Sequence, residues 1–192
     1  NQLLTISGWA RRDVARAAVK WAGAPATNAA ATGAASFTDL RSAANMGFAD
    51  PRAGDGEGGW SDQGPDNDFK EFDFQAERFG GVPFRILDPA RNQGRSVISF
   101  RHEKFPAGAR VVTVRASATN ARFLYLLHTT CWNEGKPGTP VGTLTCRGPG
   151  GRELRLEVLS GRDVADWWTP RWLPNGSPVA KKDNGSARVG VY

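Results

Sequence analysis

The densest group of chemically reactive side chains is an acidic, glycine-rich segment at residues 50–68, with five aspartates, one glutamate and five glycines. Hard cations such as calcium bind carboxylate and carbonyl oxygens that converge from a flexible loop. The spacing does not match an EF-hand, so a cation site here would have its own geometry. The candidate ligands, with Asp62, Asp66 and Asp68 ranked before the other two, are Asp50, Asp55, Asp62, Asp66 and Asp68.

The same segment has a second interpretation that needs no metal. Aspartate side chains often accept hydrogen bonds from nearby backbone N–H groups and so hold a long loop rigid. Arg52, Lys70 or Arg78 could then neutralise the carboxylates. The sequence leaves both interpretations open.

Tryptophans form the second group of interest. Of the seven in the chain, five (Trp172 among them) fall in or beside predicted loops. Indole faces stack on the apolar faces of sugars, while neighbouring polar side chains bind the hydroxyls. Because tryptophan is also largely buried in most proteins, packing in the core is the alternative for each of them. The candidate sugar-contacting residues are Trp60, His128, Trp132, Trp167 and Trp168.

Catalytic signatures are missing from the sequence. His128 lies between Leu127 and Thr129 in an apolar run, a position more typical of a structural histidine than of a general base. There is no Ser-His-Asp pattern and no nucleophile elbow, and the glycine-rich run lacks the Gly-Lys-Ser/Thr of a phosphate loop. We therefore expect no catalytic residue in this chain.

The charge and the hydropathy of the sequence limit the classes of partner that we expect. The 192 residues include 25 basic and 19 acidic side chains, a net charge of +6. A basic balance can indicate nucleic acid, anionic lipid or acidic polysaccharide, but the arginines are scattered among acidic neighbours. We predict no nucleic-acid partner. No apolar run reaches the roughly 18 residues that a membrane-spanning helix needs, so we also predict no membrane span.

Short apolar stretches separated by glycine and proline predict β-strands. In the segment at 109–117, Val112, Val114 and Ala116 alternate with polar or charged residues, as in a half-buried strand. Such strands without intervening helices favour an all-β fold, an antiparallel β-sandwich. The predicted strands cover residues 95–101, 109–117, 122–132, 141–147, 153–159 and 187–192.

The two cysteines lie on two of these strands. Pairing 122–132 with 141–147 as a hairpin places Cys146 opposite Leu127 and Cys131 opposite Gly142. This register does not bring the sulfurs together, so a disulfide needs a different register or a bulge. A disulfide and two buried free thiols both remain open.

The N-terminal part has a different pattern. Val14, Ala18 and Trp21 recur at helical spacing, with basic residues between them. We therefore expect a short N-terminal helix, with residues 1–23 forming a helical appendage. Residues 24–36 carry no charge and no large apolar side chain, as in a linker. The main domain is predicted to cover residues 37–192.

Five segments, in order along the chain, carry a family resemblance. They are Asp39–Asp50, Gly54–Asp68, Phe79–Phe84 followed by Asp88-Pro89, Leu126–His128, and Asp166–Trp168. Together they resemble a β-sandwich accessory or carbohydrate-binding module of bacterial polysaccharide-degrading enzymes. The resemblance implies a galactose-binding-like jelly roll, one structural calcium, and a secreted or periplasmic location.

The same resemblance implies a non-catalytic role. The module would bind a polysaccharide or oligosaccharide, or would brace a neighbouring catalytic domain or chain of a glycoside hydrolase or polysaccharide lyase. Two alternatives remain open. The chain could be a fragment of the hydrolase or lyase that contributes to its active site, or a purely structural protein-interaction domain.

Overall fold

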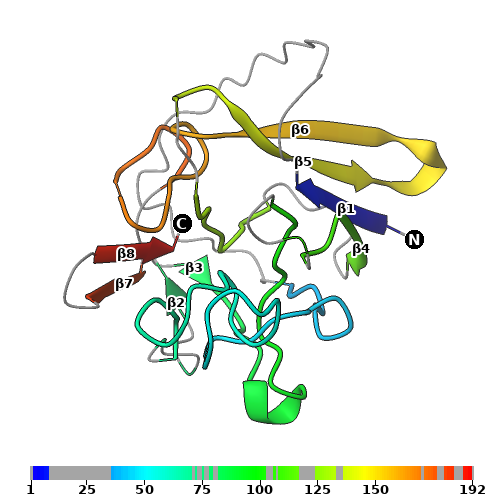
Figure 1. Cartoon of the computed structure of the whole chain (residues 1–192). Helices are drawn as coiled ribbons and strands as arrows, with labels where there is room; N and C mark the ends of the chain where they lie inside the picture. The colour runs from blue at the N-terminus through cyan, green and yellow to red at the C-terminus, as the bar shows by residue number, and fades with distance from the viewer. Residues whose placement is uncertain are drawn as a thin grey trace.

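The computed structural model describes residues 2–8, 36–70, 72, 75, 78–79, 82–102, 106, 108–116, 124–132, 136–169, 171–176, 180–183 and 188–191. Over these residues the regular elements are β-strands and two short 3-10 turns, with no α-helix, so the predicted all-β class is confirmed there (Figure 1). The elements are β1 (Gln2–Gly8), β2 (Arg78–Phe79), β3 (Val82–Pro83), η1 (Pro89–Arg91), β4 (Val111–Ala116), β5 (Pro140–Arg147), η2 (Pro149–Gly151), β6 (Glu153–Leu159), β7 (Ala180–Asp183) and β8 (Arg188–Val191).

The largest sheet has four strands in the order β4-β1-β5-β6. Strand β1 pairs antiparallel with both neighbours, so that Leu4 lies opposite Val114 on one side and Cys146 on the other. Residues 2–8 are therefore an inner strand of the sheet, and the prediction that placed them in an appendage is wrong for this stretch. The predicted helix around Val14–Trp21 and the linker at 24–36 fall, except for Ser36, outside the described residues.

Strands β4, β5 and β6 form where alternation and turn chemistry predict them. Val112 and Val114 of β4 are buried, whereas Val111 is exposed. β5 and β6 form a hairpin whose turn contains Gly150 and Gly151, both with φ in the left-handed region that glycine tolerates best. Strand β8 likewise lies within the predicted 187–192 segment.

Two other predicted strands are not regular strands in the structure. Segment 95–101 makes only isolated bridges, Met46 with Val97 and Phe100 with Ala109. The described part of 122–132 makes a single bridge, between Thr130 and Asp166. This apolar run is a connector between two hydrophobic clusters, because its successive residues Leu126 and Leu127 pack against different ones.

The core consists of those two clusters. The sheet cluster is centred on Val112, Val114 and Leu144, which β4 and β5 supply. The aromatic cluster is built from loop residues and has no regular strand at its centre. Its buried members are Phe48, Trp60, Phe69 and Trp167.

The two cysteines belong to different clusters. Cys131 packs against the aromatic cluster and Cys146 against the sheet cluster, and both are free thiols. Cys146 lies opposite Leu4 and Leu154, so the register that placed it opposite Leu127 is wrong. Burial raises the pKa of Cys131 to about 12, with Asp166 adding to the effect, so this thiol stays protonated and unreactive at neutral pH.

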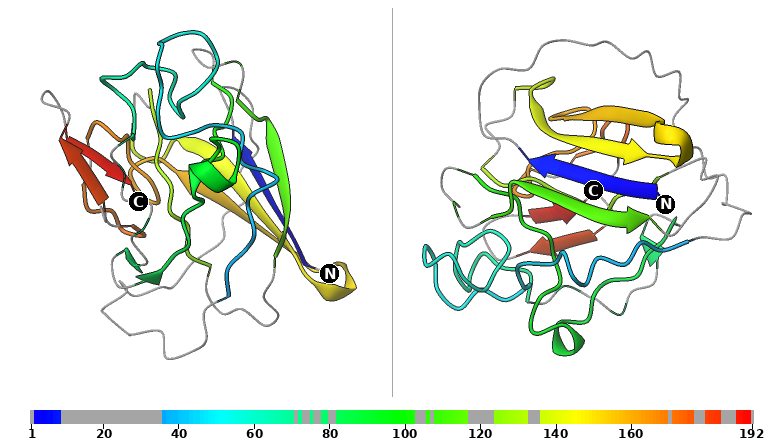
Figure 2. Two further views of the ribbon diagram at one scale, coloured as in Figure 1. Left: turned by 90° about the horizontal axis from the view of Figure 1, so that it is seen from below. Right: turned by 90° about the vertical axis from the view of Figure 1, so that its right-hand side faces the viewer.

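The remaining strands form two small ribbons, β2–β3 and β7–β8. The β7–β8 hairpin lies at the opposite end of the molecule from β4 in two views (Figures 1 and 2). A second large sheet, as a full sandwich requires, is not present in the part of the chain that the structure describes.

Shortening Leu144 should destabilise the fold much more than shortening Leu154. Leu144 is 4% exposed in the sheet cluster, whereas Leu154 is 48% exposed. We expect Leu144→Ala to lower the free energy of unfolding by about 2–4 kcal/mol, because it leaves a cavity. Leu154→Ala should cost less than about 1 kcal/mol. Urea unfolding of both variants is the measurement, and equal costs would contradict the assignment of the core.

Candidate functional site

Three aspartates of the acidic segment converge. Carboxylate oxygens of Asp50, Asp55 and Asp62 all lie within 4.8 Å of one another, although the residues are spread over thirteen positions of the chain. Asp50 and Asp62 are 1% and 8% exposed, and Asp55 is at the surface. A group of this kind could hold a metal ion, with one open side toward solvent.

The backbone holds Asp62 in place. Its Oδ1 accepts hydrogen bonds from the N–H groups of Gly54 (2.9 Å) and Asp55 (3.1 Å), and its Oδ2 accepts one from Gly56 (3.2 Å). Asp62 itself has a left-handed φ of 53°, a conformation that aspartate tolerates better than most residues. The loop at 54–56 is thus wrapped around a single carboxylate.

Asp50 is held in a similar way from the other side. Its Oδ2 accepts from the N–H of Gly64 (2.8 Å) and its Oδ1 from that of Arg52 (3.2 Å). The backbone of Gly59 passes so close that a Cβ there would lie 2.2 Å from the Cβ of Asp50. Only glycine fits at this position, which explains part of the glycine content of the segment.

These contacts show that both interpretations of the segment have a basis. Backbone N–H groups rigidify the loop, as the metal-free alternative predicts. The suggested counter-charges, however, do not reach the buried pair: Lys70 donates to the carbonyl of Pro65 (2.7 Å), and no lysine or arginine among the described residues forms a salt bridge with Asp50 or Asp62. Backbone N–H groups stabilise both buried carboxylates, and the group that they form with Asp55 could also hold a metal ion.

The ranking of the aspartates changes. Asp55 and Asp50, ranked last from sequence, join Asp62 in the converging group. Asp66 is exposed and lies outside that group. Asp68 is 2% exposed and accepts hydrogen bonds from the N–H groups of Asp50 (3.0 Å) and Lys70 (3.2 Å), so it supports the group from behind.

Two of the candidate sugar-binding tryptophans are core residues. Trp60 is 8% exposed and Trp167 is 0% exposed, and their rings meet edge to face at 4.9 Å. Phe69 stacks on Trp60 at 4.8 Å. Because both indoles are buried, they cannot stack on a sugar, and the core alternative holds for them.

Trp168 and Trp132 are half-buried, and each of them contacts a different aromatic side chain. Trp168 packs edge-on against Trp167 at 5.2 Å. Trp132 stacks on His102 at 5.7 Å, which covers one of its faces. The sequence-predicted sugar site is therefore not assembled as one surface, and for these two residues sugar contact stays a prediction.

The tryptophan that is best presented to solvent was left out of the sequence-based set. Trp172 is 79% exposed, the most exposed large hydrophobic side chain of the described residues. It precedes a tight turn in which Leu173 N–H donates to the carbonyl of Gly176 (2.9 Å). The only sequence signal was its position between Pro170 and Pro174, in a stretch with no apolar periodicity.

A polar network anchors this turn to the body of the protein. The side-chain amide of Asn175 donates to Asp163 (2.7 Å), and the backbone N–H of Asn175 donates to the carbonyl of Arg162 (3.0 Å). Burial alone would raise the pKa of Asp163, but hydrogen bonds, foremost that from Arg162, hold it below its ordinary value. Asp163 therefore remains charged and keeps the turn in place.

His128 interacts electrostatically with Asp163 of this network. The side chain is partly buried, and its desolvation lowers the pKa of His128 from 6.5 to about 4, against the opposing attraction of Asp163. At neutral pH the ring is uncharged. An uncharged, partly buried ring is consistent with the structural role that the sequence favoured.

Comparison with known proteins adds no family assignment: no family model, curated protein or solved structure matches the chain. Within the described residues, no helix has the length and hydropathy to cross a membrane.

Acid should destabilise the protein through His128. Between pH 6.5 and pH 4 the unfolded chain binds a proton that the folded state excludes, so the free energy of unfolding falls as the pH falls. The contribution of this group by pH 4.5 is about 2–3 kcal/mol. Urea unfolding at pH 7 and pH 4.5 should show a smaller loss for His128→Gln than for the unaltered protein. An equal loss in both would contradict the buried, neutral histidine.

Proposed function

We propose that this chain is a non-catalytic carbohydrate-binding or accessory module that works beside a polysaccharide-degrading enzyme. In this proposal the small sheets belong to a galactose-binding-like jelly roll, and the protein acts in a secreted or periplasmic setting. The observation that carries the proposal is the exposed indole of Trp172, next to a turn that the hydrogen bond between Asn175 and Asp163 holds in place.

Stacking on sugar requires an aromatic face that is open and held still. Trp172 is 79% exposed, and its turn is fixed through Asn175 to Asp163. A side chain that loses little freedom on binding converts more of its contact into affinity. Arg171 precedes Trp172 and Asn175 follows it closely in the chain, and both have exposed polar side chains that can bind hydroxyls.

Replacing Trp172 should weaken glycan binding. We expect Trp172→Ala to lower affinity at least about tenfold, because removal of the anchoring ring of a shallow site costs on the order of 1.4 kcal/mol or more. Affinity gel electrophoresis against a panel of neutral and acidic polysaccharides is the measurement. Tyr125→Ala is the matched control, because Tyr125 is a 46% exposed aromatic in another segment, and it should retain binding.

Two results would contradict this proposal. Retention of full affinity by Trp172→Ala would remove the stacking role. Release of new reducing or unsaturated ends from any polysaccharide by the purified chain would favour the enzyme alternative. Absence of retardation on every polysaccharide would leave bracing of a neighbouring domain as the role.

We further propose that Asp50, Asp55 and Asp62 bind one structural calcium. The donor set is oxygen only, two of the three carboxylates are buried, and backbone carbonyls or water can supply the remaining oxygen ligands. The ion would neutralise the buried pair and secure the 50–64 loop, which contributes Trp60 to the core. It has a structural role and takes no part in sugar contact.

Calcium should raise the thermal stability of the protein. At a free concentration of 100 times the dissociation constant, one site adds about 2.7 kcal/mol, which corresponds to a rise in Tm of roughly 5–10 °C for a chain of this size. Asp55→Asn should reduce the rise, because it removes one charge from the site while it keeps an acceptor. Asp66→Asn removes a charge outside the group and should leave the rise unchanged. The measurement is differential scanning calorimetry in the presence of calcium and of a chelator. An equal Tm of the unaltered protein in both conditions would contradict the site.

A further inference from the structure

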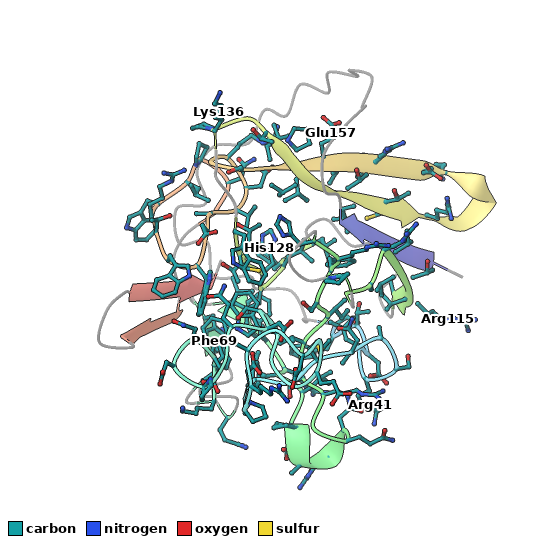
Figure 3. The ribbon with its side chains drawn as sticks, viewed as in Figure 1. Arg41, Phe69, Arg115, His128, Lys136 and Glu157 are labelled. Atoms are coloured by element: carbon teal, nitrogen blue, oxygen red, sulfur yellow. The ribbon has the colours of Figure 1, made fainter. Side chains whose placement is uncertain are left out.

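A second polar feature lies away from Trp172 and from the three aspartates. It is a surface cleft of about 420 Å³ between the turn at 41–43 and the turn at 91–95. Figure 3 shows Arg41 beside the short helical turn η1. The cleft is lined only by polar side chains, namely Arg41, Ser42, Arg91, Asn92, Gln93 and Arg95.

One amide joins the two sides of this cleft. The Nδ2 of Asn92 donates to the carbonyl of Arg41 (3.2 Å) and to that of Arg95 (3.0 Å). The second side is itself fixed, because Gly94 N–H donates to the carbonyl of Pro89 (2.8 Å). The backbones that carry the arginines are thus held next to each other, although the two turns are about fifty residues apart in the chain.

The charge of the cleft is only partly balanced. Arg41 pairs with Asp39 at 2.6 Å through one edge of its guanidinium, and Arg91 lies 3.5 Å from Asp88. Neither aspartate lines the cleft. Arg95 forms no salt bridge within the described part of the chain. Guanidinium donors therefore remain for an external acceptor, and exposed pairs of this kind contribute little to stability.

We propose that this cleft binds an oxyanion, a carboxylate or a sulfate, carried by an acidic polysaccharide. Arginine presents planar, paired donors that match the two oxygens of such a group. The site does not depend on Trp172, whereas the choice of a polysaccharide as the carrier rests on the proposed function.

The lining argues against the other polyanions. No aromatic ring borders the cleft on which a single-stranded base could stack. No apolar side chain borders it that could enter a lipid surface. The cleft is local, between two turns, and does not form the extended basic stripe that follows a nucleic-acid backbone.

The double variant Arg91→Gln/Arg95→Gln tests the site. The probes are polygalacturonate for carboxylate, dextran sulfate for sulfate, neutral dextran, and duplex DNA. We expect the variant to lose at least about fivefold in affinity for one or both acidic polymers, and the dependence of log affinity on log salt to become shallower. The polymer for which the variant loses more affinity, sulfated or carboxylated, carries the anion that the cleft prefers.

The matched control is Arg115→Gln/Arg155→Gln, which removes the same charge from exposed positions on β4 and β6. It should change affinity less than twofold, and thermal unfolding should show that both double variants fold as the unaltered protein does. An equal loss in the control would overturn the site in favour of diffuse electrostatics. Duplex DNA bound more tightly than either acidic polymer, or no binding of either polymer at low salt, would overturn it as well.

The result is separable from that for Trp172. Trp172→Ala should lower affinity for neutral and acidic polymers alike, whereas the cleft variant should affect the acidic polymers alone. If Trp172→Ala has no effect and the cleft variant does, the anion site stands and the stacking proposal fails. The reverse pattern keeps the stacking proposal and removes the anion site.

Discussion

The packing of Trp167 against Trp60 and Phe69 holds together the part of the molecule that has no sheet. Trp167 is completely buried, 4.9 Å from Trp60 and 5.5 Å from Phe69 between ring centroids. Trp167 lies about a hundred positions later in the chain than Trp60 and Phe69. Loop segments have few backbone hydrogen bonds of their own, so the burial of large aromatic surfaces must supply their cohesion.

This packing also decides which chemistry the loops can perform. An indole that fills the core is lost as a platform for a ligand. With Trp60 and Trp167 buried, Trp172 is the most exposed indole among the described residues. The same core fixes the ends of the acidic segment, since Phe69 N–H donates to the carbonyl of Phe48 (2.8 Å). The chain between them is thereby closed into a loop, and Asp50 and Asp62 face each other inside it.

Sequence reasoning succeeded where structure is local. Alternation in β4 and the glycine turn between β5 and β6 are encoded in adjacent residues, and both were predicted. It failed where the outcome depends on distant partners. Nothing near residues 2–8 indicates that they pair with β4 and β5, and the apolar run at 124–132 could not be distinguished from a strand until its two clusters were known. The segment at 50–68 was predicted as a candidate cation site, but which of its aspartates converge depends on how the backbone folds around Asp62.

The segment at 45–48 links the acidic loop to the arginine cleft. Met46 bridges to Val97, next to the turn that carries Arg95, and Gly47 bridges to Gly59, next to Asp50. The fit is tight on both sides: Gly47 N–H donates to Gly58 (2.7 Å), and a Cβ on Gly47 would lie 2.6 Å from the carbonyl oxygen of Gly94. The acidic loop and the turn that carries Arg95 therefore contact neighbouring residues of one short segment. An ion that orders the acidic loop would by the same contacts steady the turn that presents the arginines.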